Sequence, residues 1–136
     1  MRLRLDVAPE TLNLPVPTMV LQTLVENAIK YGISARPEGG EITISARIED
    51  EALCIIVTNP GQLSFAATTD RSHRSTRLGL RNAEARLQLL FGDRARVSLR
   101  QFAPDVVAAD IVVPLRSADI ARIVPPVAPP RRPVSV

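Results

Sequence analysis

Residues 16–32 carry apolar side chains around most of the circumference of a predicted helix. A helix with so few polar positions is buried on nearly every side. One narrow polar stripe interrupts it, because four residues follow the i, i+3, i+4, i+7 spacing of a helix face: Thr23, Glu26, Asn27 and Lys30. A solvated outer face would explain such a stripe on an ordinary amphipathic helix. On a helix that is otherwise apolar, the stripe favours an acid, an amide and an ammonium group that line a cleft.

The ends of this helix are marked by residues with special backbone preferences. Pro15 and Pro17 stand where prolines are tolerated, at a helix start, and Gly32 stands where a helix usually stops. A second helix is predicted to end at Gly92, its expected C-terminal cap, because apolar residues from Leu80 to Phe91 recur on one helical face.

Five segments have the pattern of strands. Residues 2–7 and 41–48 alternate apolar and polar side chains, as half-buried strands do. Residues 52–57 are almost continuously apolar and rich in β-branched side chains, which predicts a central strand. Two last strands are expected over residues 96–102 and 106–113. Three acidic residues between the second and third segments mark a hairpin turn.

The composition suits a single folded domain, with 46% hydrophobic and 23% charged residues among 136. No apolar run is long enough to span a bilayer, so we expect no membrane segment in this chain. The N-terminus lacks the pattern of a signal peptide. The single cysteine, Cys54, cannot form a disulfide within the chain.

The formal net charge of +3 comes from the C-terminal part of the chain. Residues 1–115 hold 13 arginine or lysine and 13 aspartate or glutamate residues, whereas residues 116–136 hold four arginines and one aspartate. That last stretch is also crowded with prolines, and we expect it to be a disordered tail. Because aromatic residues make up 3% of the chain and tryptophan is absent, no stacking platform for nucleic-acid strands is expected.

The string LVENAIKYG, residues 24–32, resembles the N box of the GHKL superfamily of gyrases, heat-shock chaperones, sensor histidine kinases and mismatch-repair ATPases. The longer string LQTLVENAIKYG is most similar to the LytS-like sensor histidine kinases. The resemblance implies that Glu26 positions or polarises the reacting group and that Asn27 coordinates the magnesium ion carried by ATP. It also implies that Lys30 and Tyr31 lie near the phosphates and the nucleotide. One amide ligand can suffice, because magnesium keeps substrate phosphates as further oxygen ligands.

The string TNPG after the third predicted strand resembles the first glycine box of the same superfamily. Asn59 stands where the family usually has an aspartate that accepts a hydrogen bond from the adenine amino group, and an amide oxygen can also accept that bond. Gly61 matches the first glycine of the box, while Leu63 stands where a second is often found. Taken alone, the string would indicate a simple turn, but its place after the N box favours nucleotide binding.

Residues 62–76 show no periodicity, and we expect them to form the lid, a mobile loop that closes over the phosphates. Four arginines begin near its end: Arg71, Arg74, Arg77 and Arg81. They could bind the triphosphate as bidentate donors or could equally form a solvated face.

The string STRLGLRN resembles the second glycine box, which is typically GTGIGLRN, and Gly79 and Leu80 match it. Ser75 and Arg77 stand where the family usually has glycines, which let backbone N–H groups approach phosphate. A helix N-terminus is expected near Gly79 and would still attract an anion.

The resemblance implies a two-layer α/β sandwich of the Bergerat type over residues 1–115, with a mixed, mostly antiparallel sheet and helices on one face. It implies the Mg-ATP-binding catalytic domain of a two-component sensor histidine kinase, which donates the γ-phosphoryl group to a histidine on a separate domain. The implied partners are the histidine-bearing dimerisation domain of the same kinase, missing here, and a response regulator. We expect a cytoplasmic domain, such as the cytoplasmic end of a membrane-anchored sensor, that is inactive in isolation.

Two other functions stay open. The altered glycine boxes also suit a degenerate GHKL module that serves as a regulatory or docking surface. An anti-sigma-like serine kinase shares the fold and can be this short, and it would be favoured if Met1 is the natural start. The chain opens directly on a predicted strand, which favours a truncated chain.

Overall fold

The computed structural model describes residues 1–11, 14, 18–33, 38–62 and 71–116 of the chain. In chain order the elements are β1 (Arg2–Val7), the 3-10 turn η1 (Pro9–Thr11), α1 (Thr18–Ala28), the π-helical segment η2 (Ile29–Ile33), β2 (Glu41–Glu49), β3 (Ala52–Pro60), α2 (Arg71–Phe91), β4 (Arg96–Ala103) and β5 (Val106–Pro114). The predicted tail from residue 117 onward and the two prolines predicted at the first helix start lie outside the described residues. In the part of the chain that is described, no helix combines the length and the hydropathy of a bilayer-spanning segment.

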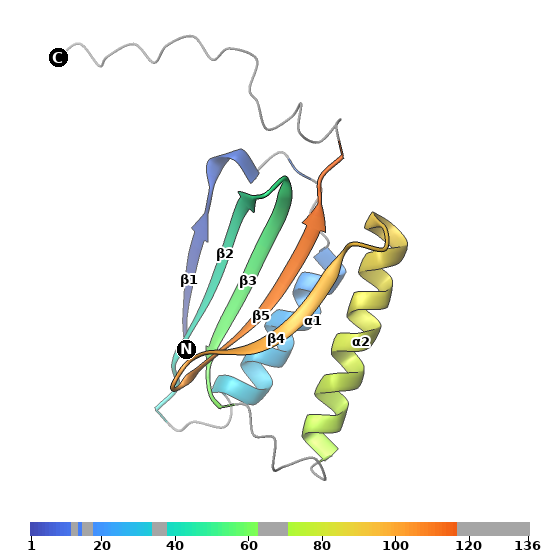
Figure 1. The fold of residues 1–136 in the computed structure, drawn as a ribbon. Coiled ribbons are helices and arrows are strands. Elements are labelled where there is room, and N and C mark those ends of the chain that lie inside the picture. The colour runs from blue at the N-terminus through green and yellow to red at the C-terminus, as the bar shows by residue number, and fades with distance from the viewer. Residues whose placement is uncertain (12–13, 15–17, 34–37, 63–70, 117–136) are drawn as a thin grey trace, which may run out of the picture.

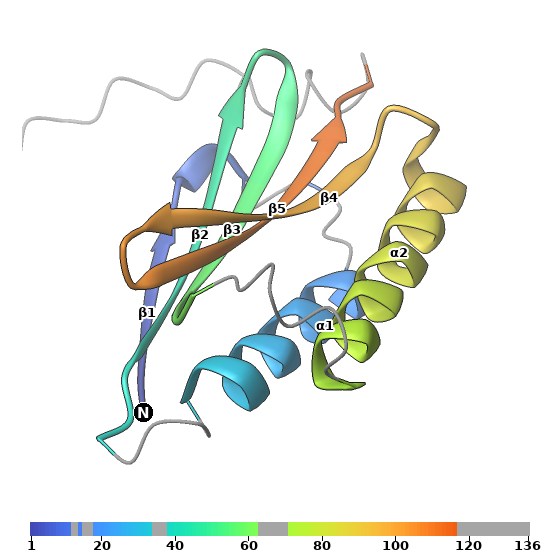
Figure 2. The same cartoon turned by 60° about the horizontal axis from the view of Figure 1, so that its bottom comes forward.

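The five strands form one sheet in the order β1-β2-β3-β5-β4. β1 runs parallel to β2, and the other neighbouring pairs are antiparallel. Both long helices lie on the same face of the sheet, which is clear when Figures 1 and 2 are compared. The predicted fold class, a two-layer α/β sandwich with a mixed, mostly antiparallel sheet, is confirmed.

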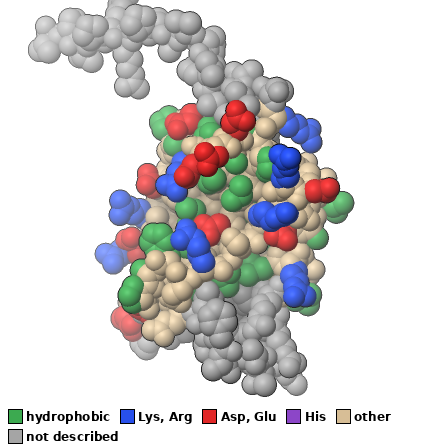
Figure 3. Space-filling view, viewed as in Figure 1, with side chains coloured by type: hydrophobic (Ala, Val, Ile, Leu, Met, Phe, Trp, Pro, Cys, Tyr) green, Lys and Arg blue, Asp and Glu red, His purple; other side chains and the backbone are tan. Residues whose placement is uncertain are grey.

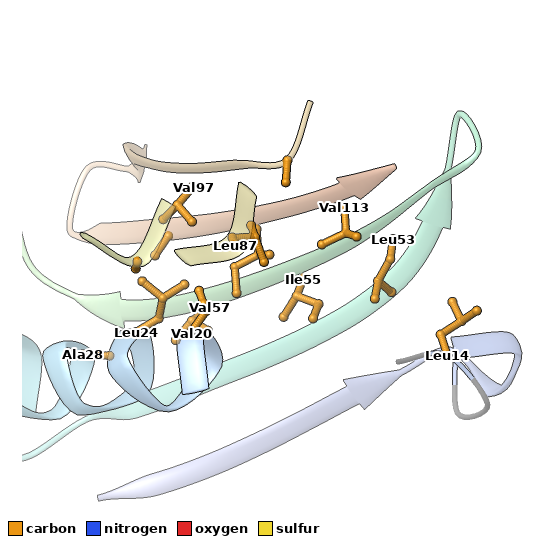
Figure 4. Close-up of a cluster of buried hydrophobic side chains, with 14 of the residues drawn as sticks. Leu14, Val20, Leu24, Ala28, Leu53, Ile55, Val57, Leu87, Val97 and Val113 are labelled. Atoms are coloured by element: carbon orange, nitrogen blue, oxygen red, sulfur yellow. The ribbon is translucent and has the colours of Figure 1, made fainter. Parts of the chain in front are cut away.

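The hydrophobic core lies between the sheet and the two helices (Figure 4). Because side chains alternate along a strand, Leu53, Ile55 and Val57 of β3 all point to the helix side. Leu24 of α1 and Leu87 of α2 meet them there and are 1% and 0% exposed. Burial of each such side chain contributes about 1.5–3 kcal/mol, so the core fixes how α1 and α2 sit on the sheet.

The opposite face of the sheet carries charged side chains of both signs. Figure 3, viewed as in Figure 1, shows basic and acidic side chains interspersed around apolar side chains on this side of the molecule. The mixture gives this face no extended field of one sign.

The hairpin between β2 and β3 turns at two acidic residues, as the sequence predicts. Asp50 and Glu51 both have positive φ angles, of 52° and 59°. Two successive residues with positive φ form the turn whose twist matches that of a β-hairpin, and this turn prefers the pair Asn-Gly.

Replacing Asp50 and Glu51 together by Asn-Gly is therefore expected to stabilise the protein by about 1 kcal/mol, because asparagine and glycine tolerate positive φ better than the native pair. Thermal unfolding measures this as a higher Tm. Replacing the pair by two alanines should lower the Tm. A higher Tm in the alanine variant would contradict a turn with positive φ at both positions.

Helix α2 ends where the sequence predicts. Gly92 follows the last helical residue with a φ angle of 100°, and its N–H donates to the Gln88 carbonyl at 2.8 Å. A glycine in this conformation is the common C-terminal cap of a helix.

Candidate functional site

The polar stripe predicted on the first helix lies along α1 and η2. Thr23 and Asn27 are half-buried, whereas Glu26 and Lys30 are exposed. Two side chains of the stripe, Thr23 and Asn27, are therefore partly buried. The carboxylate of Glu26 and the ammonium group of Lys30 lie at the surface. The backbone of Tyr31 continues η2, and its side chain lies outside the described structure.

Two of these side chains are held by their own helix. The Thr23 hydroxyl donates to the Met19 carbonyl at 3.0 Å. Gln22 donates through Nε2 to the Glu26 carboxylate, also at 3.0 Å. This bond orients a carboxylate that stays accessible from outside the molecule.

Asn27 has a buried amide nitrogen with no hydrogen-bond partner among the described residues. A buried donor without a partner costs about 1–3 kcal/mol, so it requires an explanation. Gly79 of α2 lies opposite, where an added Cβ atom would be 4.0 Å from Asn27 Nδ2. Because an amide can turn by half a rotation, the same position can present its oxygen atom. The chemistry of Asn27 therefore fits an added ligand that supplies a polar or metal partner.

A hollow of about 170 Å³ lies between α1 and α2, which pack side by side (Figure 2). Thr23 lines it from α1, and Gly79, Asn82 and Arg86 line it from α2. Pockets that enclose a whole drug-sized ligand measure roughly 300 Å³ or more, so this hollow can take only part of a nucleotide. It adjoins Asn27 through the shared neighbour Gly79.

Asn59 is brought against the end of the first helix by a glycine. A Cβ atom at Gly32 would lie 2.5 Å from Asn59 Nδ2 and 2.8 Å from Asn59 Cβ. Both distances are too short for a Cβ atom, so only glycine fits at this position without a shift of its neighbour. Gly32 lies within η2 and is absent from the positive-φ glycines of the described chain. The prediction that Gly32 stops the helix is therefore wrong, because the helical segment continues to Ile33 and the glycine serves the close approach of Asn59.

The amide of Asn59 has a defined orientation. Its Nδ2 donates to the Pro60 carbonyl at 2.8 Å, and a backbone carbonyl can only accept, so the nitrogen must lie on that side. The Asn59 oxygen is the atom turned away from Pro60. The predicted strand also proves longer, because β3 continues to Pro60 and pairs Asn59 with Val107.

Gly61 follows β3 with a φ angle of 151°, a value that favours glycine. Its N–H donates to the Asp105 carbonyl at 3.0 Å. Gly61 thus ties the end of β3 to the connection between β4 and β5, beside Asn59.

Helix α2 begins before the predicted start. It starts at Arg71, so Gly79 lies well inside it, and the predicted helix N-terminus near Gly79 is wrong. The pattern predicts a loop over residues 71–76, but these residues are helical. Ser75 and Arg77 explain the difference, because serine and arginine favour a helix over glycine by roughly 0.5–1 kcal/mol each. The N–H of Gly79 is inside the helix and cannot serve an anion as a free helix terminus does.

The other residues predicted around the second glycine box have separate positions. Leu80 is half-buried and packs against the hydrophobic core. Arg81 is exposed. The side chain of Arg77 lies outside the described structure, as do residues 63–70 of the predicted lid.

Two groups with shifted pKa values lie on the sheet face opposite the helices. The Asp110 carboxylate accepts a hydrogen bond from Arg100 at 2.7 Å and raises the pKa of that guanidinium. Partial burial raises the pKa of the Cys54 thiol, and the nearby Glu49 carboxylate raises it further. Both groups belong to strands whose helix-side neighbours form the core, so they lie away from Asn27 and Asn59.

Comparison with known proteins shows which proteins the chain resembles. No family model matches the sequence. The sensor histidine kinase BtsS of Escherichia coli (strain K12) is 33% identical over 100 residues, which make up 72% of this chain and 17% of BtsS. The sensor histidine kinase/phosphatase LytS of Staphylococcus aureus (strain MRSA252) is 34% identical over 101 residues, or 68% of this chain and 17% of LytS. The chain is therefore a GHKL-superfamily domain of the kind that these sensor histidine kinases contain.

The fold of the chain agrees with that assignment. The catalytic domain of the histidine kinase ThkA matches it with a TM-score of 0.61 and 18% identity, over 83% of this chain and 79% of that one. ThkA in complex with the response regulator protein TrrA also matches with a TM-score of 0.61. The chain spans only about a sixth of the length of BtsS and LytS, at 17% of each.

Two residues of the site escape sequence reasoning. Gly32 has a visible place in the N box, but only the fold reveals that it faces Asn59. Gln101 of β4 donates to the Gly61 carbonyl across 40 positions of sequence. No local pattern marks Gln101, and knowledge of the strand pairing would be needed to find it.

Proposed function

We propose that this chain is the Mg-ATP-binding catalytic domain of a two-component sensor histidine kinase. It donates the γ-phosphoryl group of ATP to a histidine on a separate domain, and a response regulator receives the group in turn. The structured elements run from Arg2 to Pro114, which suits a folded domain over residues 1–115. Because ATP is supplied inside the cell, the domain acts in the cytoplasm.

The observation that carries the proposal is the unpartnered, buried amide of Asn27 beside the hollow between α1 and α2. Magnesium prefers oxygen ligands and keeps substrate phosphates and water as its other ligands, so one asparagine suits it. Among the described residues no cluster of three His, Cys, Asp or Glu side chains forms a separate metal site. Asn27 would hold the metal, which neutralises phosphate charge when it is bound.

Other residues of the site have roles that their exposure and contacts support. Glu26 is exposed and oriented by Gln22, so a histidine on another domain can reach it and be oriented or deprotonated there. Lys30 would offset phosphate charge, and Arg77 could add to it as a guanidinium donor, while Tyr31 would lie near the nucleotide. Phosphoryl transfer of this kind depends mainly on positioning and charge stabilisation.

The base end of the site is supported by Asn59 and Gly61. Asn59 turns its amide oxygen away from Pro60, and that oxygen can accept a hydrogen bond from the amino group of adenine. Gly61 allows the backbone turn beside it. Gly79 contributes the close approach of α2 to Asn27, and Leu80 contributes packing.

A degenerate GHKL module without turnover is the second candidate. The observation that favours it is the continuous helix α2 through Ser75 and Arg77, where glycines would let backbone N–H groups bind phosphate. Such a module would act as a regulatory or docking surface.

Two measurements test the proposal in sequence. Calorimetry with Mg-ATP is expected to show binding that weakens when EDTA removes the metal. A histidine-bearing helical domain supplied with labelled ATP and this chain is then expected to become phosphorylated. Binding without transfer would favour the degenerate module, and absence of binding would reject both the metal site and the kinase function.

Lys30→Met is expected to weaken Mg-ATP binding about fivefold at low ionic strength, because it removes a positive charge near the phosphates. The loss should shrink at 1 M salt, where charges are screened over about 3 Å. Titration of Mg-ATP at both salt concentrations measures this. Lys30→Arg keeps the charge and should bind like the native chain, and an equal loss for Lys30→Met at both salt concentrations would contradict the electrostatic role.

A further inference from the structure

The end of β3 is held by a glutamine from a distant strand. Gln101 Nε2 donates to the Gly61 carbonyl at 3.0 Å. The same nitrogen donates to the Ala103 carbonyl at 2.7 Å and to the Val106 carbonyl at 3.1 Å. One amide group with two hydrogens thus gathers three backbone carbonyls from two segments.

The strand register places Gln101 in line with Asn59, the residue proposed to accept a hydrogen bond from adenine. Val107 of β5 pairs with Asn59 on one side and with Gln101 on the other. Residues paired directly across a sheet share one face, so Asn59, Val107 and Gln101 all lie toward the helix side. A register shift between Gln101 and Ala103 re-aims β4 at this point, as β-bulges do.

Hydrogen bonds hold both polar backbone groups of Gly61, and we call this pair of bonds the clamp. The Gly61 carbonyl accepts from Gln101, and its N–H donates to Asp105 in the β4–β5 connection. Both polar groups of its backbone are therefore tied to the same hairpin. Asn59 lies two residues earlier, and its own amide is bonded to Pro60 between them. Movement of Gly61 would move the carbonyl that orients Asn59.

We infer that Gln101 is a positioning residue for recognition of the nucleotide base, because it fixes Gly61 and through it the Asn59 amide. This inference rests on the proposed function. It concerns the preference for a purine with an amino group at position 6 over one with an oxo group. The Asn59 oxygen can accept from the amino group of adenine, and it has no hydrogen to offer to the oxygen of guanine.

The experiment compares the affinities of the chain for Mg-ATP and Mg-GTP by calorimetry. Gln101→Met keeps the size of the side chain and removes its donors, and it should reduce the ATP:GTP affinity ratio about tenfold. Gln101→Lys keeps donors that can reach the carbonyls and should restore most of the ratio. The charge of the lysine acts on both triphosphates equally, so the ratio is insensitive to it.

Gln88→Met is the matched control. Gln88 also donates through Nε2 to backbone carbonyls, those of Asp93 and Ala95, at the other end of β4. Its replacement should lower the Tm about as much as Gln101→Met while leaving the ratio unchanged. An unchanged ratio in Gln101→Met, or an equal fall in Gln88→Met, would overturn the inference.

Hydrogen exchange of the Gly61 amide separates this inference from the proposed function. Exchange reports local opening without any nucleotide. Gln101→Met should speed exchange at Gly61 about tenfold, and Gln88→Met should not. Unchanged exchange at Gly61 would reject the clamp even if ATP binds, whereas a native chain that binds neither nucleotide would reject the proposed function and the role in base recognition with it.

Discussion

Asn27→Ala is expected to lower the affinity for Mg-ATP about a hundredfold, which corresponds to roughly 2.7 kcal/mol. The expected loss arises because the substitution removes the amide proposed to hold the metal. The stability of the free protein should stay unchanged or rise, since the buried Asn27 nitrogen has no partner among the described residues and costs about 1–3 kcal/mol. Calorimetry with Mg-ATP and thermal unfolding of the free chain measure the two effects.

The opposite signs of the two effects give this substitution its value. A residue that only supports the fold would lose stability and affinity together, whereas a ligand-binding residue is retained at a cost to stability. With EDTA present, the native chain should bind ATP no better than Asn27→Ala. Asn27→Asp keeps an oxygen ligand and should keep most of the metal dependence. A lower Tm for Asn27→Ala with unchanged affinity would show that Asn27 is structural.

Gly32→Ala is expected to destabilise the protein by about 2 kcal/mol and to weaken Mg-ATP binding at least tenfold. The added Cβ would lie 2.5 Å from Asn59 Nδ2 and 2.8 Å from Asn59 Cβ, so a side-chain rotation alone cannot relieve the overlap. The end of β3 must move away from η2, and Asn59 moves with it. Chemical denaturation and calorimetry measure the two losses.

A double-mutant cycle isolates the cause of the instability. Gly32→Ala combined with Asn59→Ala removes the overlapping amide, so much of the lost stability should return while ATP binding stays weak. Gly79→Ala is the matched glycine control for stability, because its Cβ would meet only Asn27 Nδ2 at 4.0 Å, and alanine favours a helix by about 1 kcal/mol. If the double variant is as unstable as the sum of the single variants, the contact between Gly32 and Asn59 is not the cause.

Local patterns in the sequence predict most of the fold. The alternation of residues 2–7 and 41–48 and the apolar run of residues 52–57 predict strands because a period of two is a local property. The capping Gly92 is predictable because the φ preference of glycine is local, and the β2–β3 turn is predictable because acidic residues interrupt two apolar strand patterns.

The start of α2 shows where the pattern fails. A string aligned to a glycine box predicts a loop only as long as its glycines remain. With Ser75 and Arg77 in their place, intrinsic helix preference extends the helix to Arg71. The resemblance identified the family, and the altered residues changed the local structure.

The candidate site is predictable only in part for a different reason. Glu26, Asn27 and Lys30 share a helix face, so their proximity follows from spacing alone. The contact of Gly32 with Asn59 and the bonds of Gln101 depend on how distant elements pack. Sequence separation hides such contacts, because no short-range rule relates β4 to the end of β3.

The most direct test of the account is nuclear magnetic resonance of the side-chain amides with Mn²⁺ in place of Mg²⁺. The paramagnetic ion broadens the signals of nearby groups, and Gln88, bonded to the Ala95 carbonyl at the far end of α2, serves as the distant reference. With ATP present and Mn²⁺ added stepwise to the Mg²⁺-loaded chain, we expect the Asn27 signal to broaden and disappear at a much lower Mn²⁺ fraction than the Gln88 signal, because the broadening falls steeply with distance from the ion. An Asn27 signal that remains sharp when the site is saturated would contradict a magnesium-nucleotide site at Asn27.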